Sequence, residues 1–185
     1  MFKKLLLVGA VLTSMVSFSQ EVDFGFQAGY INMEGKSSSS VGNVSASGNS
    51  SGYFLGMLAD FPVSENLHIR PSVNYANADE TNILFVPILA QYYIQDSGFY
   101  FHAGPQATFL LDNVSLGGVD ILKTFGLDLA LGIGYEIDEN FFLEAKYSFE
   151  LTNRYTKEIK DAASSQGADV TSRLNALTLG IGYKF

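Results

Sequence analysis

The stretch LNALTLGIGYKF, residues 174–185, carries the pattern that decides the fold. Every second residue from Leu177 to Phe185 is large and apolar, and the residues between them are Thr, Gly or Lys. Side chains of a β-strand alternate between the two faces of a sheet, so this period of two indicates a strand with one apolar face.

Seven other stretches alternate in the same way. Residues 124–135 are the clearest example, because Leu127, Leu129 and Leu131 share one parity while Asp128 and three glycines share the other. Most stretches have about the 9 to 11 residues that a tilted strand needs to cross a bilayer. The eight predicted strands are residues 22–33, 52–61, 67–75, 83–94, 99–111, 124–135, 141–152 and 174–185. Within 83–94 both faces are apolar, and we favour the parity of Leu84 as the outer one.

The predicted connections alternate between short turns and longer loops. Short turns are expected at 62–66, 95–98 and 138–140, long loops at 34–51, 112–123 and 153–172, and an intermediate loop at 76–82. Short turns on one rim and long loops on the other are typical of outer-membrane barrels. An even number of strands puts both termini on the short-turn rim. The serine-rich loop around Lys36 is expected to be a flexible spacer rather than a binding epitope.

Side-chain volume decides which face of the strands points outward. An eight-stranded barrel has an interior only just wide enough for side chains. About five large apolar residues from each strand would overfill it, so the bulky face must point outward. An outer band that apolar exceeds what a monomer exposes to water and requires lipid. The small face contains ten strand glycines, namely Gly25, Gly29, Gly52, Gly56, Gly104, Gly126, Gly132, Gly134, Gly180 and Gly182.

We therefore predict an all-β fold, an eight-stranded antiparallel up-and-down transmembrane β-barrel. Aromatic residues near the strand ends of the outer face predict two interfacial girdles. The alternative is a soluble barrel with these aromatics in its core. Pro71, Pro87 and Pro105 fall inside predicted strands, so each is expected at a bulge or opposite an unpaired carbonyl.

The N-terminus has the layout of a secretory signal. Lys3 and Lys4 precede an apolar run that is too short to span a bilayer, and small residues surround Phe18. We predict a signal peptide at 1–19 and a barrel domain at 20–185. Without the two lysines, 9 basic residues face 19 acidic ones, a net charge of −10 that argues against a nucleic-acid partner. The chain contains no cysteine, which excludes disulfides and a lipidation site at the cleavage point.

Several motifs resemble those of the small outer-membrane β-barrel domain family, which includes PorT-like proteins and is similar to the transmembrane barrel of OmpA-like porins. They are the run Phe85 to Leu89, the pair Gly104 and Pro105, the glycine-patterned strand from Gly126 to Tyr135, and the terminal Phe185. The ending with Gly180, Tyr183 and Phe185 resembles the C-terminal targeting signal of such barrels. This implies the outer membrane of a Gram-negative bacterium, with long loops extracellular and termini periplasmic. It also implies contacts with outer-membrane lipid, periplasmic chaperones and the barrel assembly machinery.

Charged residues on the small face are predicted to form an ion-pair network that fills the lumen, because buried charges must be paired. A symmetric turn at 62–66 would put His68 across from Asp60 and Arg70 on the diagonal. Glu144 and Lys146 would face Gly134 and Gly132. The predicted network is Asp60, His68, Arg70, Asp128, Glu136, Glu144, Lys146 and Glu150. A polar pore lining is the alternative.

Catalysis has little support in the sequence. Asp128 and Glu150 could face each other as an acid/base pair, but nothing near them supplies a nucleophile. His68, His102 and Ser72 share the inward parity and form no recognisable triad. We predict no enzyme, no metal site and no cofactor. The favoured function is a structural or surface-interaction protein that works as a monomer. The alternatives are a narrow pore for small or hydrophobic solutes and a lipid-modifying enzyme.

Overall fold

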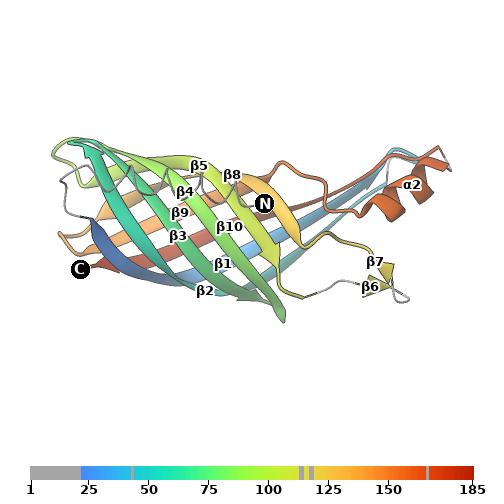
Figure 1. The fold of residues 1–185 in the computed structure, drawn as a ribbon, viewed down its shortest axis with the longest axis horizontal. Helices are drawn as coiled ribbons and strands as arrows, with labels where there is room; N and C mark the ends of the chain where they lie inside the picture. Colours follow the sequence, from blue (N-terminus) through green and yellow to red (C-terminus); the bar gives the residue numbers. More distant parts are fainter. Residues whose placement is uncertain (1–21, 43, 113–114, 117–118, 166) are drawn as a thin grey trace, which may run out of the picture.

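The computed structural model describes residues 22–185 except 43, 113–114, 117–118 and 166. The signal peptide predicted at 1–19 lies outside the described residues. Eight strands form a closed barrel in which every neighbouring pair is antiparallel (Figure 1). This confirms the predicted fold. In chain order they are β1 (Asp23–Ser39), β2 (Val44–Ser64), β3 (Leu67–Ala78), β4 (Thr81–Tyr93), β5 (Phe99–Leu110), β8 (Phe125–Glu136), β9 (Phe141–Glu150) and β10 (Val170–Lys184).

The last strand closes the barrel against the first. β10 pairs with β1 from Lys184 opposite Gly25 to Val170 opposite Ser39. The Phe185 amide then donates a hydrogen bond to the Phe24 carbonyl at 2.8 Å. The two ends of the barrel sequence therefore meet on the rim formed by the connections after β2, β4 and β8, which we name the short-turn rim. The opposite end, with the connections after β1, β3, β5 and β9, is the loop rim.

The bulky face of each strand points outward, as volume predicted. On β8, Leu127, Leu129 and Leu131 are 40 to 43% exposed, while Asp128 and Ala130 are 2% and 0% exposed. β4 follows the favoured parity, because Ile88 is exposed and Leu89 is buried. An apolar surface of this kind, on every strand of a closed barrel, matches a hydrocarbon surrounding.

Outward aromatic side chains pair near the strand ends, as expected of interfacial girdles. Near the short-turn rim, the ring centroids of Phe99 and Tyr135 lie 4.7 Å apart, those of Phe141 and Tyr183 4.9 Å, and those of Phe26 and Phe185 5.7 Å. Near the loop rim, Phe109 and Phe125 lie 5.3 Å apart.

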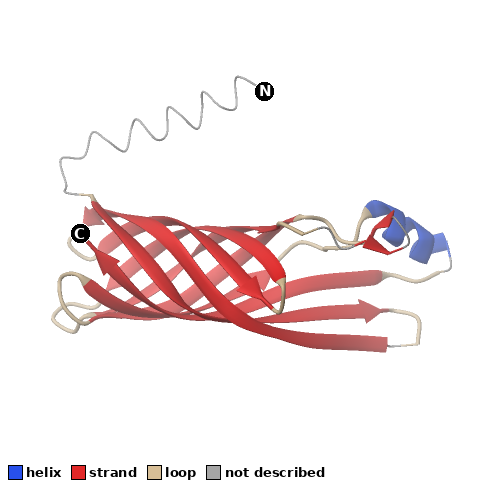
Figure 2. Ribbon diagram, turned by 90° about the horizontal axis from the view of Figure 1, so that it is seen from below, coloured by secondary structure: helices blue, strands red, loops and turns tan. Residues whose placement is uncertain are grey.

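The prediction of a flexible loop at 34–51 was wrong. β1 and β2 continue past the barrel as a long hairpin, and β10 extends beside β1 (Figure 2). Glu34 is paired with both Asn49 and Asn175. Serine-rich composition indicates flexibility only for a chain without partners, and here backbone groups of neighbouring strands supply the hydrogen bonds regardless of side chain. The three strands form a sheet that overhangs the loop rim.

The intermediate loop predicted at 76–82 is a two-residue hairpin turn. Asp79 and Glu80 both have positive φ, 44° and 67°, as in the type I′ turn that matches the twist of paired strands. The other two connections on this rim are longer. One carries a small hairpin of β6 (Ser115–Leu116) and β7 (Val119–Asp120), and the other carries the unpredicted helix α2 (Lys157–Ser165). Across the described ranges, no helix has the length and apolarity to cross a bilayer.

The three prolines do not sit at bulges. Pro71 pairs with Ile88, and Pro87 pairs with Gln106, and the same register holds on both sides of each proline. Printed along these ladders, pairing is interrupted beside Pro71 and Pro87 between β3 and β4, and beside Pro105 between β4 and β5. The missing amide donors thus cost local pairs without shifting the strands, which corresponds to the unpaired-carbonyl alternative.

We expect Glu80→Gly to stabilise the barrel by about 0.5 to 1 kcal/mol, because an L-residue at positive φ is strained and glycine is not. Urea titration of the folded fraction in lipid vesicles measures the change. Glu65→Gly, in the turn after β2 where φ is not positive, is the control and should give no gain. Equal effects of the two substitutions would contradict the assigned turn.

Candidate functional site

The lumen consists of two chemically different layers. Charged and aromatic side chains fill the short-turn end, and an apolar cluster fills the loop end. Both layers come from the inward parity of the strands. The polar layer holds every predicted network residue of β2, β3 and the strand ends at the short-turn rim, and its centre is Arg70.

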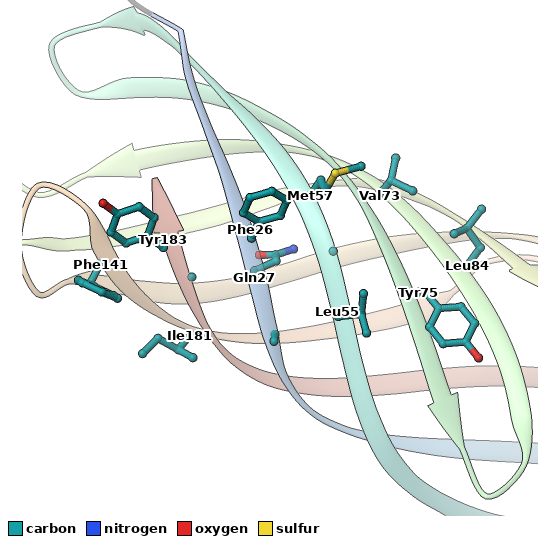
Figure 3. A pocket seen from close by; sticks show the side chains of 13 residues that line it. Phe26, Gln27, Leu55, Met57, Val73, Tyr75, Leu84, Phe141, Ile181 and Tyr183 are labelled. Carbon is teal, nitrogen blue, oxygen red and sulfur yellow. The ribbon is translucent and has the colours of Figure 1, made fainter. Parts of the chain in front are cut away.

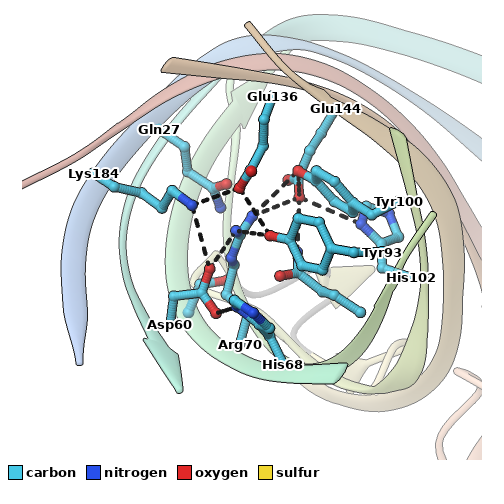
Figure 4. A network of polar contacts seen from close by, with 12 residues as sticks. Gln27, Asp60, His68, Arg70, Tyr93, Tyr100, His102, Glu136, Glu144 and Lys184 are labelled. Carbon is cyan, nitrogen blue, oxygen red and sulfur yellow. Dashed lines mark hydrogen bonds and ion pairs between the residues drawn. The ribbon is translucent and has the colours of Figure 1, made fainter. Parts of the chain in front are cut away.

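Arg70 lies on the barrel axis, surrounded by acceptors and aromatic rings (Figure 4). It is 2% exposed. Its Nη2 donates to Asp60 Oδ2 at 2.6 Å, and its Nη1 donates to Glu144 Oε1 at 3.0 Å. The guanidinium carbon also lies 4.6 Å from the centroid of the Phe142 ring. One cation thereby compensates two buried carboxylates that come from opposite sides of the lumen.

The Asp60 side of this network reaches the C-terminal strand. His68 Nδ1 lies 2.9 Å from Asp60 Oδ1. Lys184 Nζ lies 3.8 Å from Asp60 and donates to Glu136 Oε1 at 2.5 Å. The Tyr93 hydroxyl also donates to Glu136, at 3.0 Å. β2, β3, β4, β8 and β10 are therefore joined across the lumen by side chains.

The Glu144 side of the network is equally saturated. Tyr100 donates to Glu144 Oε1 at 2.9 Å and Gln91 at 3.3 Å, and His102 Nδ1 lies 3.3 Å away. Glu144 stands opposite Gly134 and Lys146 opposite Gly132, as the turn symmetry predicted. A Cβ at Gly134 would overlap the Tyr100 ring, so this glycine provides the space that the network needs.

A second group of polar residues lies farther towards the loop rim. Asp128 accepts hydrogen bonds from Thr108 and from Gln106 Nε2, the latter at 2.9 Å, and Lys146 Nζ donates to Gln106 Oε1 at 3.2 Å. Asp128 and Glu150 are paired in register, as expected. Glu150 is compensated by Arg154, whose Nε lies 2.5 Å from Glu150 Oε1. The two carboxylates thus have separate partners rather than one shared function.

An apolar plug closes the loop end of the lumen, which the sequence reasoning did not foresee. Its members are all less than 9% exposed and come from six strands: Ile31, Met33, Phe54, Ala76, Ala78, Ile83, Phe85, Leu110 and Ala176. Between the plug and the polar layer lies a void of about 10 Å³, lined by Phe54, Asn74, Gln106 and Lys146 among others. That volume holds about one water molecule. The lumen is filled from end to end.

The structure corrects one detail of the predicted network. β2 and β3 pair Phe61 with Ile69 and Pro62 with His68, so Arg70 stands across from Asp60 and His68 takes the diagonal. Both still contact Asp60. The reasoning missed Tyr93, Tyr100, His102 and Lys184, although Tyr100, His102 and Lys184 share the inward parity and could have been found by it. Arg154 follows β9 and had no periodic signal.

The arrangement does not resemble a catalytic centre. His68 contacts Asp60 and His102 contacts Glu144, while the Ser72 hydroxyl accepts from Asn74 at 3.0 Å. The described residues contain no group of three His, Asp or Glu side chains that could hold a metal ion. The absence of an enzymatic function remains a prediction.

A shallow groove of about 650 Å³ lies on the outer wall (Figure 3). Outward side chains of β1, β2, β3 and β10 form it, and they include Phe26, Leu55, Met57 and Ile181 around the small Ala28. Ala28 pairs with Leu55 on one side and Ile181 on the other, so the groove follows from one small residue in a bulky row. It belongs to the lipid-facing surface.

We expect Arg70→Met to destabilise the barrel by about 3 to 5 kcal/mol, because it leaves Asp60 and Glu144 buried without their shared cation. Adding Asp60→Asn should recover part of the loss. Lys36→Met is the matched control, because the ion pair of Lys36 with Glu34 at 2.8 Å is exposed and worth under about 1 kcal/mol. Urea unfolding in lipid vesicles compares the three, and equal stability of Arg70→Met and Lys36→Met would refute the network.

Comparison with known proteins gives three results. Residues 79–155 match the family model described as outer membrane protein beta-barrel domain. No curated protein matches the chain. Among solved structures, Neisserial surface protein A superposes with a TM-score of 0.51 at 20% identity, over 90% of this chain and 100% of that one. Ail, the attachment invasion locus protein of Yersinia pestis, gives 0.50 at 16% identity with the same coverage.

At these identities the structural likeness shows the fold alone, and both relatives are small outer-membrane barrels. The matched segment runs from the turn after β3 to the start of the loop after β9, so it contains four consecutive strands of the closed wall. The PorT-like subgroup stays a prediction. The matched segment and the eight-stranded barrel together identify the chain as a member of the outer membrane protein beta-barrel domain family.

Proposed function

We propose that this outer-membrane barrel is a non-conducting membrane protein whose function lies at its loop rim rather than in its lumen. The observation that carries the proposal is the filled interior, in which a polar network and an apolar plug leave a void of about 10 Å³ between them. Opening a water path would require the buried Arg70, Asp60 and Glu144 to lose their partners. A structural or surface-interaction role, without catalysis, fits this interior.

We further propose that the termini are periplasmic and the loop rim extracellular. In support, the short-turn rim has compact connections, whereas the loop rim carries the long hairpin, α2 and the β6 and β7 hairpin. Outer-membrane barrels have their longer loops on the extracellular side. The proposed partners are outer-membrane lipid around the monomer, periplasmic chaperones, and the assembly machinery reading Gly180, Tyr183 and Phe185. Of these, Phe185 is 64% exposed and available for such contacts.

In planar bilayers the refolded protein should show no steady ionic conductance. Lys146→Ala should also remain silent, because the plug above Lys146 is intact in that variant. Truncating the plug with Phe54→Ala and Phe85→Ala together should permit brief openings at most, since the Arg70 network still blocks the lumen. Heat-modifiable mobility on gels verifies that each variant is folded. Steady openings of the wild type that Lys146→Ala abolishes would overturn the closed-lumen proposal.

The orientation is tested by cysteine labelling, since the chain has no cysteine of its own. Ser164→Cys in α2 and Glu139→Cys in the turn after β8 are both exposed positions. In intact cells, a membrane-impermeant maleimide should label Ser164→Cys and leave Glu139→Cys unmodified until the outer membrane is permeabilised. The reverse result would mean that the barrel is inserted the other way round.

A further inference from the structure

A hollow of about 570 Å³ lies at the loop rim, directly on top of the plug, and we name it the mouth cup. Met33 and Leu110 form its floor and are 4% and 7% exposed. Both also belong to the apolar plug. The cup is therefore closed at its base, and a molecule that enters it cannot pass into the lumen.

One wall of the mouth cup is the inner face of the overhanging sheet, which consists of small residues. Gly35 is flanked by Gly48 and Leu174 in one row, and Ser37 by Ala46 and Ser172 in the next. A Cβ at Gly48 would meet nothing within 4 Å, and neither Gly48 nor Gly35 has a positive φ. Because glycine destabilises a strand interior and no backbone conformation demands it here, the result of these glycines is open space.

The opposite wall comes from the loops after β5 and β9. Ile121, Leu122 and Tyr155 line the cup, and Leu122 and Tyr155 are joined by an isolated β-bridge. Together with Met33 and Leu110, they make the lining mainly apolar. Two loops that are distant in sequence are thereby fastened to each other above the plug.

Arg154 is the buried polar residue in this wall. It is 1% exposed, and its Nη1 donates to the carbonyls of Lys123 at 3.3 Å and Thr124 at 3.0 Å. Its charge is compensated by Glu150, 2.5 Å from Nε. Within the part of the chain that the structure describes, Nη2 has no hydrogen-bond partner. A buried donor without a partner is unfavourable, and a ligand with an acceptor atom would relieve it.

We propose that the mouth cup binds a small neutral amphiphile, which consists of an apolar aromatic or aliphatic body and one hydroxyl or carbonyl oxygen. The apolar lining takes the body, and Arg154 Nη2 donates to the oxygen. A neutral ligand is specified because Glu150 already balances the charge of Arg154. The cup volume falls in the range of small-molecule sites. This goes beyond the proposed closed barrel by giving its loop rim a ligand, and it makes the cup a receptor site and not a channel entrance.

The test uses the refolded full chain in lipid nanodiscs and 1-naphthol as the probe, followed by its fluorescence. Gly48→Leu places a side chain in the cup where there is room for it, and it should weaken binding about tenfold or more by occupying that volume. Ser45→Leu is the matched control, because it adds the same side chain to the opposite face of β2 and should bind as the wild type does. Heat-modifiable mobility confirms that both variants fold.

The role of Arg154 is tested by comparing probes on the wild type. Replacing 1-naphthol by 1-methylnaphthalene should weaken binding about tenfold, the effect of one hydrogen bond from a charged donor. 1-Naphthoate should bind no better than 1-naphthol, because the charge of Arg154 is already paired. Unchanged affinity of Gly48→Leu, an equal loss in Ser45→Leu, or equal binding of the two neutral probes would each overturn the proposal. Conductance is a separate readout, so a failure here leaves the closed-lumen test unaffected.

Discussion

The narrow interior of an eight-stranded barrel is the constraint on which the rest of the structure depends. A cylinder of this size has room for side chains and nothing more. Large residues must therefore point to lipid, and each large residue that points inward needs a small neighbour. Gly134 leaves space for Tyr100 and Gly182 for Phe142, since a Cβ at either glycine would overlap the ring beside it. The glycine pattern of the strands is thus the complement of the few bulky groups on the axis.

The same constraint explains why charges can occupy the lumen. In so narrow a space, Arg70 reaches carboxylates of β2 and β9 at the same time, and Lys184 reaches Glu136 and Asp60. Each charge is compensated by contacts that cross the barrel instead of following one strand. Such pairs contribute little net stability compared with apolar packing, but removing one partner is costly. We infer that the network holds the strands in register, because a strand shifted by one residue would turn its charge towards lipid.

The wall could be predicted from sequence and part of the interior could not. Period-two patterning is a direct record of which side of each strand meets lipid, so β8 and β10 were identified almost to the residue. Serines carry no such record, and the pairing of Glu34 with Asn49 and Asn175 depends on neighbours that composition does not reveal. The plug was missed because Ile31, Phe54 and Phe85 are bulky residues on the small parity, and the volume argument treated each parity as uniform. Arg154 lies after the end of β9, where periodicity stops.

The division of the lumen into a polar and an apolar layer determines where the protein can act. A solute moving through would have to pass an apolar layer that disfavours ions and then a charged layer that disfavours apolar molecules. No single class of solute suits both layers. The plug also has a second face, because Met33 and Leu110 meet the lumen below and the mouth cup above. The residues that close the barrel are therefore the ones that give its outer rim an apolar floor, and this floor lies where the overhanging sheet and the two long loops converge.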